Sequence, residues 1–165
     1  MSEDSALRKK LRRRQRRLAA LLRLAGLVDA TALCAVLMPG SMLAMVHDFI
    51  GLGPFPDDRI VGYLARSTSL LYAMFGTLML YLSFHVAEYR PLIQFFAGLF
   101  ATCGLFFLGI DIVESMPLWW IAGEGPVVVA VGASLLWLAR QCAAAEREIA
   151  VAEKSQAVSA TRKHF

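Results

Sequence analysis

The 165-residue sequence is poor in charged side chains, and this shortage excludes whole classes of protein. Only 18% of the residues are Asp, Glu, Lys or Arg, while 58% are hydrophobic. Soluble domains have about 25% charged and about 45–50% apolar residues, so the composition argues against both a water-soluble globule and a disordered chain. The sequence therefore predicts a membrane protein.

Cysteine is scarce, and the motifs of soluble enzymes are missing. Cys34, Cys103 and Cys142 are an odd number and form no C-x-x-C pair, which argues against a disulfide scaffold and against a thiol oxidoreductase. There is no G-x-S-x-G setting for a nucleophile and no glycine-rich phosphate loop. We therefore predict no soluble enzyme and name no catalytic residue, and catalysis inside the membrane stays open without a motif to locate it.

Basic residues are concentrated at the N-terminus. Nine of the 17 Lys and Arg precede residue 24, and this block has no aromatic residue to stack a nucleic-acid base. An apolar run from 18 to 38 follows directly. That run is longer than the core of a signal peptide, which has about 7–15 residues, and it contains Asp29. We interpret the block as a cytoplasmic anchor before a retained first span, and not as a nucleic-acid binder.

Four apolar segments are long enough to cross a hydrocarbon core, which needs about 20 helical residues. They are residues 18–38, 68–87, 92–113 and 126–145. Helices are the expected form because open strand edges cannot be satisfied in lipid. The predicted fold class is an all-α integral membrane protein, a four-transmembrane-helix bundle. Its membrane domain, 18–145, lies between a basic segment, 1–17, and a tail, 146–165, that extends the fourth helix and frays near Ser155.

Local signals predict how the helices begin and pack. Asp57 and Asp58 offer N-cap chemistry for the second helix, and Pro91 suits the first turn of the third. Because the connection 88–91 is so short, the second and third helices are predicted to be antiparallel neighbours. Small residues four apart, which let backbones approach, occur in every span: Gly26 and Ala30, Ala73 and Thr77, Ala97 and Ala101, Gly98 and Thr102, Ala130 and Ser134.

The distribution of Lys and Arg predicts the orientation. The N-terminal block, Arg90 and the tail carry nearly all of them, whereas the two other connections have only Arg59 and Arg66. Since basic residues favour the cytoplasmic side, both termini are predicted to lie in the cytoplasm. In the first outer connection, apolar residues at helical spacing over 41–51 predict a short interfacial helix.

Ionisable residues at membrane depth are the candidates for chemistry, because each costs about 2.5–3.5 kcal/mol unless it finds a partner. The outer face has a candidate polar network of Arg66, Asp111, Glu114, Glu124, His47 and Asp48. The inner face has a candidate polar group of Asp29, His85 and Arg90.

Two interpretations of these groups stay open. Arg66 paired with Asp111 or Glu124, and Asp29 paired with His85, would satisfy buried charge and fix helix register. A polar pocket, a proton relay or a divalent-metal site would use the same residues functionally. No H-x-x-E-H or similar spacing is present, so we predict no metal and no other cofactor.

Short motifs resemble those of small four-helix inner-membrane proteins of bacteria that are distantly related to the DoxX group. They are Met-Pro at 38–39, L-A-R-S-T-S-L-L-Y at 64–72, Y-R-P-L-I at 89–93, G-I-D at 109–111 and E-G-P at 124–126. The resemblance covers about residues 24–140. It implies the fold and a bacterial inner membrane, and it implies no activity or catalytic residue.

The sequence thus predicts a small membrane protein that is an accessory or structural subunit, or that binds a lipid or small ligand at its outer mouth. The alternative is a small transporter or a proton-coupled membrane enzyme that uses the outer carboxylates. The expected partners are membrane lipids, other membrane proteins or a second copy of the chain, and not nucleic acid.

Overall fold

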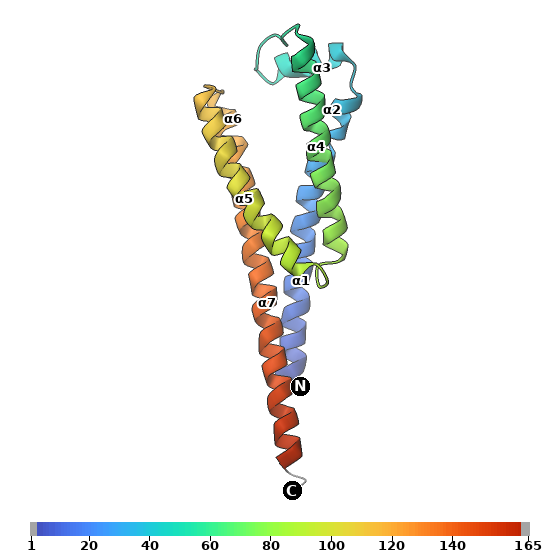
Figure 1. Ribbon diagram of the computed structural model, residues 1–165, viewed down its shortest axis with the longest axis vertical. Coiled ribbons are helices and arrows are strands. Elements are labelled where there is room, and N and C mark those ends of the chain that lie inside the picture. The colour runs from blue at the N-terminus through green and yellow to red at the C-terminus, as the bar shows by residue number, and fades with distance from the viewer. Residues whose placement is uncertain (1–2, 163–165) are drawn as a thin grey trace.

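Long apolar helices make up most of the chain in the computed structural model, which describes residues 3–162, with side chains from 5 to 155 (Figure 1). The helices are α1 (Glu3–Ala30), α2 (Leu33–Leu37), α3 (Gly40–Phe49), α4 (Arg59–Phe84), α5 (Arg90–Val113), α6 (Leu118–Gly123) and α7 (Gly125–Arg162). Four stretches are long and apolar enough to cross a membrane: Ser5–Leu37, Arg59–Phe84, Arg90–Val113 and Leu118–Ser155. The predicted all-α bundle with four candidate spans is confirmed.

Helix ends follow the local chemistry of the sequence. The Asp58 carboxylate accepts a hydrogen bond from the Ile60 N–H at 3.0 Å and caps α4, and Pro91 lies in the first turn of α5. The first apolar segment is interrupted at Thr31, whose hydroxyl donates to the Val28 carbonyl at 2.6 Å, so α1 and α2 are separate. α7 continues past Ser155 to Arg162, so the predicted fraying near Ser155 is wrong.

The predicted short helix of the first connection is present as α3. It follows Pro39, and its apolar side chains lie on the surface, with Phe49 89% exposed and Met45 70% exposed. Within the described part of the chain these side chains stay uncovered, which fits a helix that lies in a membrane interface.

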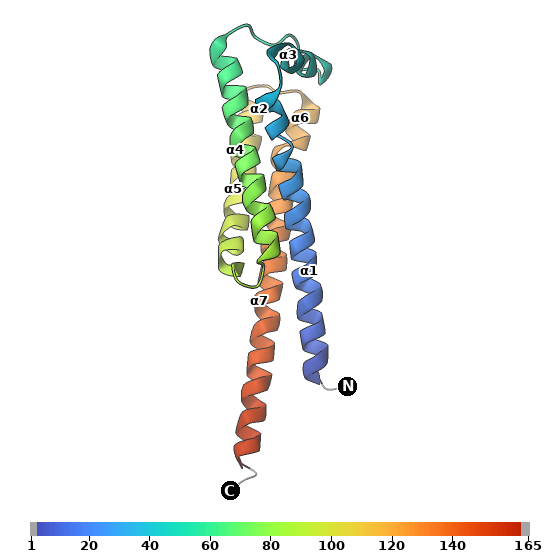
Figure 2. The same ribbon diagram turned by 90° about the vertical axis from the view of Figure 1, so that its right-hand side faces the viewer.

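The helices form two arms that diverge in Figure 1. One arm pairs α4 with α1, and the other pairs α5 with α7, while α1 also packs on α7. We call the end that carries α3 and α6 the loop end. Both ends of the described chain lie at the opposite end, the terminal end, where α1 runs beside α7 (Figure 2).

Glycines decide which helices approach closely. A Cβ on Gly76 would lie 2.5 Å from the Ala30 nitrogen and 2.6 Å from the Gly26 oxygen, and one on Gly132 would lie 2.5 Å from the Ala101 nitrogen. Backbone contact therefore joins α1 to α4 and α5 to α7. A Cβ on Gly98 would meet nothing within 4 Å, so the predicted packing stripe at Gly98 faces away from other helices.

α4 and α5 run antiparallel and are in contact, as predicted, but their backbones are not closely packed. The short turn joins their ends, but the small residues of α4 face α1 and those of α5 face α7. α4 and α5 instead meet through large aromatic side chains, such as Phe75 and Phe96, whose ring centroids are 5.8 Å apart.

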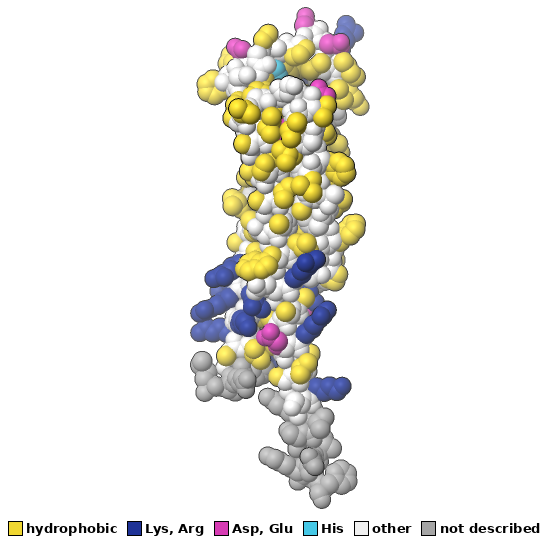
Figure 3. All heavy atoms as spheres, turned by 90° about the vertical axis from the view of Figure 1, so that its left-hand side faces the viewer, with side chains coloured by type: hydrophobic (Ala, Val, Ile, Leu, Met, Phe, Trp, Pro, Cys, Tyr) yellow, Lys and Arg dark blue, Asp and Glu magenta, His cyan; other side chains and the backbone are white. Residues whose placement is uncertain are grey.

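The basic N-terminal segment and the tail pair with each other. Buried Leu18 and Leu22 of α1 and Cys142 of α7 belong to one hydrophobic core. Farther along, Arg8 forms an ion pair with Glu153 at 2.5 Å, and Lys10 with Glu148 at 3.7 Å. Figure 3 shows apolar side chains over the middle of one face and basic side chains toward the terminal end.

Candidate polar site between the two arms

Glu124 joins the two arms near the loop end. It lies between α6 and α7 with its side chain half-buried. Its Oε1 accepts a hydrogen bond from the Tyr72 hydroxyl at 3.3 Å, and its Oε2 accepts one from the Trp120 indole N–H at 2.5 Å. Since Tyr72 belongs to α4, this carboxylate bonds across the gap between the arms.

Asp111 is the most deeply buried acidic residue of the described side chains. It is 5% exposed, on the face of α5 that also carries buried Ala97 and Gly104. Its backbone oxygen accepts a hydrogen bond from the Met116 N–H at 2.9 Å, but its Oδ2 is buried with no hydrogen-bond partner. A buried carboxyl oxygen without a partner is costly.

Asp29 approaches the same region from α1. Its Oδ2 is also buried without a hydrogen-bond partner. Its Cβ lies beside Gly76 of α4, and Gly76 is one helical turn along α4 from Tyr72. Of the three carboxyl groups, Glu124 is hydrogen-bonded to Tyr72, and Asp29 and Asp111 lie within electrostatic range of its hydroxyl. We call Tyr72 and these three carboxyl groups the acidic site.

Arg66 does not belong to the acidic site. Its Nη2 donates to the Met38 carbonyl at 3.0 Å and so serves the end of α2. Within the described residues no ion pair joins Arg66 to Asp111 or Glu124. The predicted charge network fails because Arg66 faces α2 on one arm, whereas both carboxylates lie on the other arm.

The remaining outer candidates lie apart from the acidic site. His47 donates from Nδ1 to the Gly53 carbonyl at 2.8 Å and packs edge-on against Phe55, which holds the first connection together. Asp48 and Glu114 are exposed. Among the described residues, no group of three or more His, Cys, Asp or Glu could hold a metal ion.

The structure does not bring Asp29 to His85. Because Gly26 crosses Gly76 in the antiparallel pair of α1 and α4, Arg23 lies opposite the end of α4 instead. The Arg23 Nε donates to the Ser83 hydroxyl at 3.2 Å, and its guanidinium lies 4.5 Å from the centre of the Phe84 ring. The predicted Asp29–His85 pair is therefore wrong.

His85 and Arg90 have separate structural roles near the turn between α4 and α5. The His85 Nδ1 donates to the Tyr81 carbonyl at 3.0 Å, and Arg90 forms an ion pair with Glu146 of α7. The hydrogen bond of Tyr89 with Tyr81, together with neighbouring Glu88, raises the pKa of Tyr89 to about 12. This hydroxyl therefore stays protonated near neutral pH, and the turn supplies no phenolate.

Tyr72 and Trp120 are site residues that the sequence did not reveal. The spacing from Trp120 to Glu124 is a usable signal, because residues four apart share a helix face. Tyr72 carries no charge, and only the packing of α4 brings it to Glu124.

An aromatic groove leads to the acidic site between α4 and α5. It has a volume of about 80 Å³, and it is lined by Tyr72, Phe75, Phe96, Leu99, Phe100, Cys103 and Phe107. The Tyr72 and Phe107 ring centroids are 6.4 Å apart. Tyr72 thus belongs to both the groove and the acidic site.

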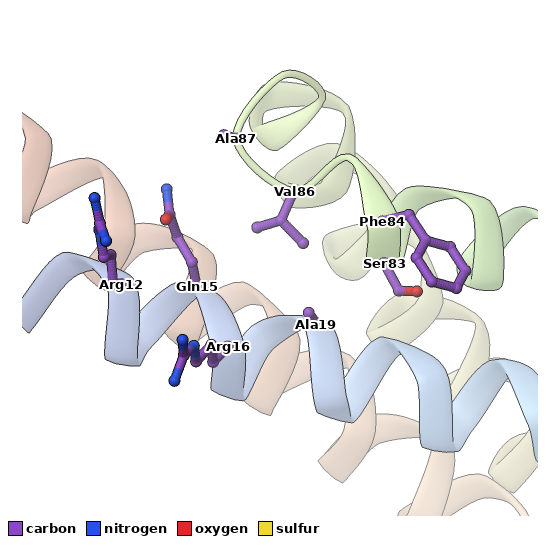
Figure 4. A pocket seen from close by; sticks show the side chains of 8 residues that line it. All are labelled: Arg12, Gln15, Arg16, Ala19, Ser83, Phe84, Val86 and Ala87. Atoms are coloured by element: carbon purple, nitrogen blue, oxygen red, sulfur yellow. The ribbon is translucent and has the colours of Figure 1, made fainter.

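A second groove, at the terminal end, is bordered by basic instead of aromatic side chains. Between α1 and the end of α4, a groove of about 290 Å³ is lined by Arg12, Arg16 and Val86 among others (Figure 4). Figure 4 shows the Arg12 side chain pointing to the same side as Gln15, while Arg16 points away from both.

The four candidate spans and their packing indicate an all-α, multi-pass membrane protein. No family model, no curated protein and no solved structure matches this chain. The resemblance to relatives of the DoxX group stays a prediction.

Proposed function

We propose that this protein spans a bacterial inner membrane with its terminal end in the cytoplasm, and that its acidic site binds an amphiphilic amine. The ligand class is a lipid or small molecule with an ammonium head and an apolar body. One observation carries the proposal: Tyr72 lines the aromatic groove and also donates to Glu124, so an apolar surface and an acidic group meet at one side chain.

The charge of the acidic site favours a cation. Its three carboxyl groups lie near Tyr72, and none of them has an ion-pair partner among the described residues. At an effective dielectric constant of about 20, opposite charges 4 Å apart attract by about 4 kcal/mol. This is comparable to the roughly 2.5–3.5 kcal/mol that an amine costs at membrane depth, so a carboxylate such as Glu124 offsets that cost.

The groove supplies the apolar half of the recognition. Each buried methylene contributes about 0.8 kcal/mol, and a cation beside an aromatic face gains about 0.5–2 kcal/mol. With a volume of about 80 Å³ the groove holds part of an alkyl chain, and the rest of the chain lies along the apolar helix surfaces.

Binding of a simple amine tests the proposal. The full chain in neutral detergent is titrated with dodecylamine and with dodecanol, and binding is measured by calorimetry or native mass spectrometry. We expect the amine to bind at least tenfold more tightly than the alcohol. Glu124→Gln should weaken amine binding about tenfold, which is about 1.4 kcal/mol, and leave alcohol binding unchanged.

Glu114→Gln is the matched control, because Glu114 is an exposed carboxylate at the same end of the molecule. Equal amine affinities for Glu124→Gln and Glu114→Gln would contradict the proposal. An accessory or structural subunit predicts a different result, in which neutralising Glu124 or Asp111 lowers the abundance of the protein and changes no ligand affinity.

A second candidate function is proton-coupled transport or catalysis, and the unpartnered oxygens of Asp111 and Asp29 favour it. A carboxyl group buried without a cation costs less as the acid than as the carboxylate, which suits a group that takes up and releases a proton. The two candidates need different groups, since an amine is held by Glu124, whereas a proton relay requires the titratable oxygen of Asp111.

A further inference from the structure

The terminal end carries a basic groove between α1 and α7. Its volume is about 470 Å³, and Lys9, Lys10, Arg13, Arg14 and Arg17 line it together with Trp137. Among the side chains that the structure describes, no carboxylate lines this groove. It therefore gathers five positive charges on one side of α1.

Three of these cations have no hydrogen-bond or ion-pair partner among the described residues. Lys10 pairs with Glu148, and the Arg14 Nη1 donates to the Gln141 carbonyl at 2.9 Å. Lys9, Arg13 and Arg17 make no hydrogen bond or ion pair with any described residue. They are four residues apart and so share a helix face, where like charges repel. An anion bound from outside the chain would offset that repulsion.

Trp137 places the groove at a membrane surface. It is 59% exposed on α7, and it lines the groove beside Arg17. Exposed tryptophan favours the headgroup level of a bilayer. Basic side chains also gather where the apolar band of the molecule ends (Figure 3). The anion available at that level is the phosphate of a phospholipid headgroup.

We propose that Lys9, Arg13 and Arg17, with Trp137, bind the phosphate of an anionic phospholipid in the leaflet at the terminal end. The two guanidinium groups offer paired donors that match phosphate oxygens, and the indole packs against the lipid below the headgroup. The groove on the α4 side of α1 is a weaker candidate, because its two arginines point apart in Figure 4. This inference does not depend on the acidic site.

Lipid selectivity of the full chain tests the inference. The protein is purified in neutral detergent, and its affinities for phosphatidylglycerol and phosphatidylcholine are measured by native mass spectrometry. We expect phosphatidylglycerol to bind at least tenfold more tightly. The variant Lys9→Gln/Arg13→Gln/Arg17→Gln should lose this preference, because juxtamembrane cations each attract anionic lipid.

The matched control is Arg140→Gln/Arg147→Gln/Lys154→Gln, which removes the same charge from exposed positions of α7. It should keep the preference. Equal loss in both variants, or equal binding of both lipids by the unaltered protein, would overturn the inference. Competition by millimolar inorganic phosphate would also overturn it, since the groove would then bind free phosphate. Tight binding of single-stranded RNA without lipid selectivity would assign the groove to nucleic acid instead.

Discussion

At the scale of single residues, the acidic site consists of carboxyl groups that have no ion-pair partner among the described residues. The sequence shows these residues as charges inside apolar segments, and their cost predicts that they matter. It does not show their partners, because a hydrogen bond such as that from Tyr72 to Glu124 joins residues 52 positions apart. Arg66, which the charge pattern offers as a partner for these carboxyl groups, instead donates a hydrogen bond to the Met38 carbonyl. A pattern of charges along the sequence does not indicate such a bond to the backbone.

Asp111→Asn tests the state of the most buried carboxyl group. Because its Oδ2 accepts no hydrogen bond and Asp111 has no ion pair among the described residues, an amide of the same shape should change the free energy of unfolding by less than about 1 kcal/mol. The measurement is thermal or denaturant unfolding of the full chain in mild detergent. Glu114→Gln, at an exposed site, gives the reference value.

A loss of about 3–5 kcal/mol in Asp111→Asn would contradict this account, because that is the cost of breaking a buried ion pair. The same variant in sealed vesicles addresses proton coupling. Loss of proton uptake with unchanged stability would favour the second candidate function over amine binding.

At the scale of helices, backbone contact at glycine decides which elements pair. The sequence predicts where helices begin, since caps such as Asp58 and first-turn residues such as Pro91 act within one turn. It does not predict pairing reliably, because Gly76 and Gly98 look equivalent as small residues, yet only Gly76 faces another backbone. For the same reason, the short turn after α4 predicts that α4 and α5 are antiparallel neighbours, but it does not show that large aromatic side chains keep their backbones apart.

Gly76→Ala should open the contact between α1 and α4. The added Cβ would lie 2.5 Å from the Ala30 nitrogen, and a backbone atom cannot move away at little cost. We expect a loss of about 1–3 kcal/mol in the free energy of unfolding, measured by denaturant titration in detergent. Gly98→Ala is the control, since the added Cβ would enter open space. Alanine also favours a helix more than glycine does, so this variant should not lose stability. Equal stability of the two variants would refute this assignment of the helix contact.

At the scale of the whole molecule, charge and apolarity are arranged along one axis. Both ends of the described chain lie at the end where basic side chains gather, and the four candidate spans run from that end to the loop end. The sequence predicts this arrangement well, because span length and charge distribution are sums over many residues. The pairing of α1 with α7 beyond the apolar region depends on ion pairs between the two ends of the sequence, and composition alone does not reveal it.

The orientation of these spans is the central claim, and site-directed labelling tests it most directly. Single cysteines replace Asp57 in the exposed first connection and Lys154 in the tail, in a background where Cys34, Cys103 and Cys142 are alanine. Bacterial cells with a permeabilised outer membrane are treated with a membrane-impermeant maleimide. We predict that Asp57→Cys is labelled at once and Lys154→Cys only after the inner membrane is opened. Labelling of Lys154→Cys in cells with an intact inner membrane would contradict the account.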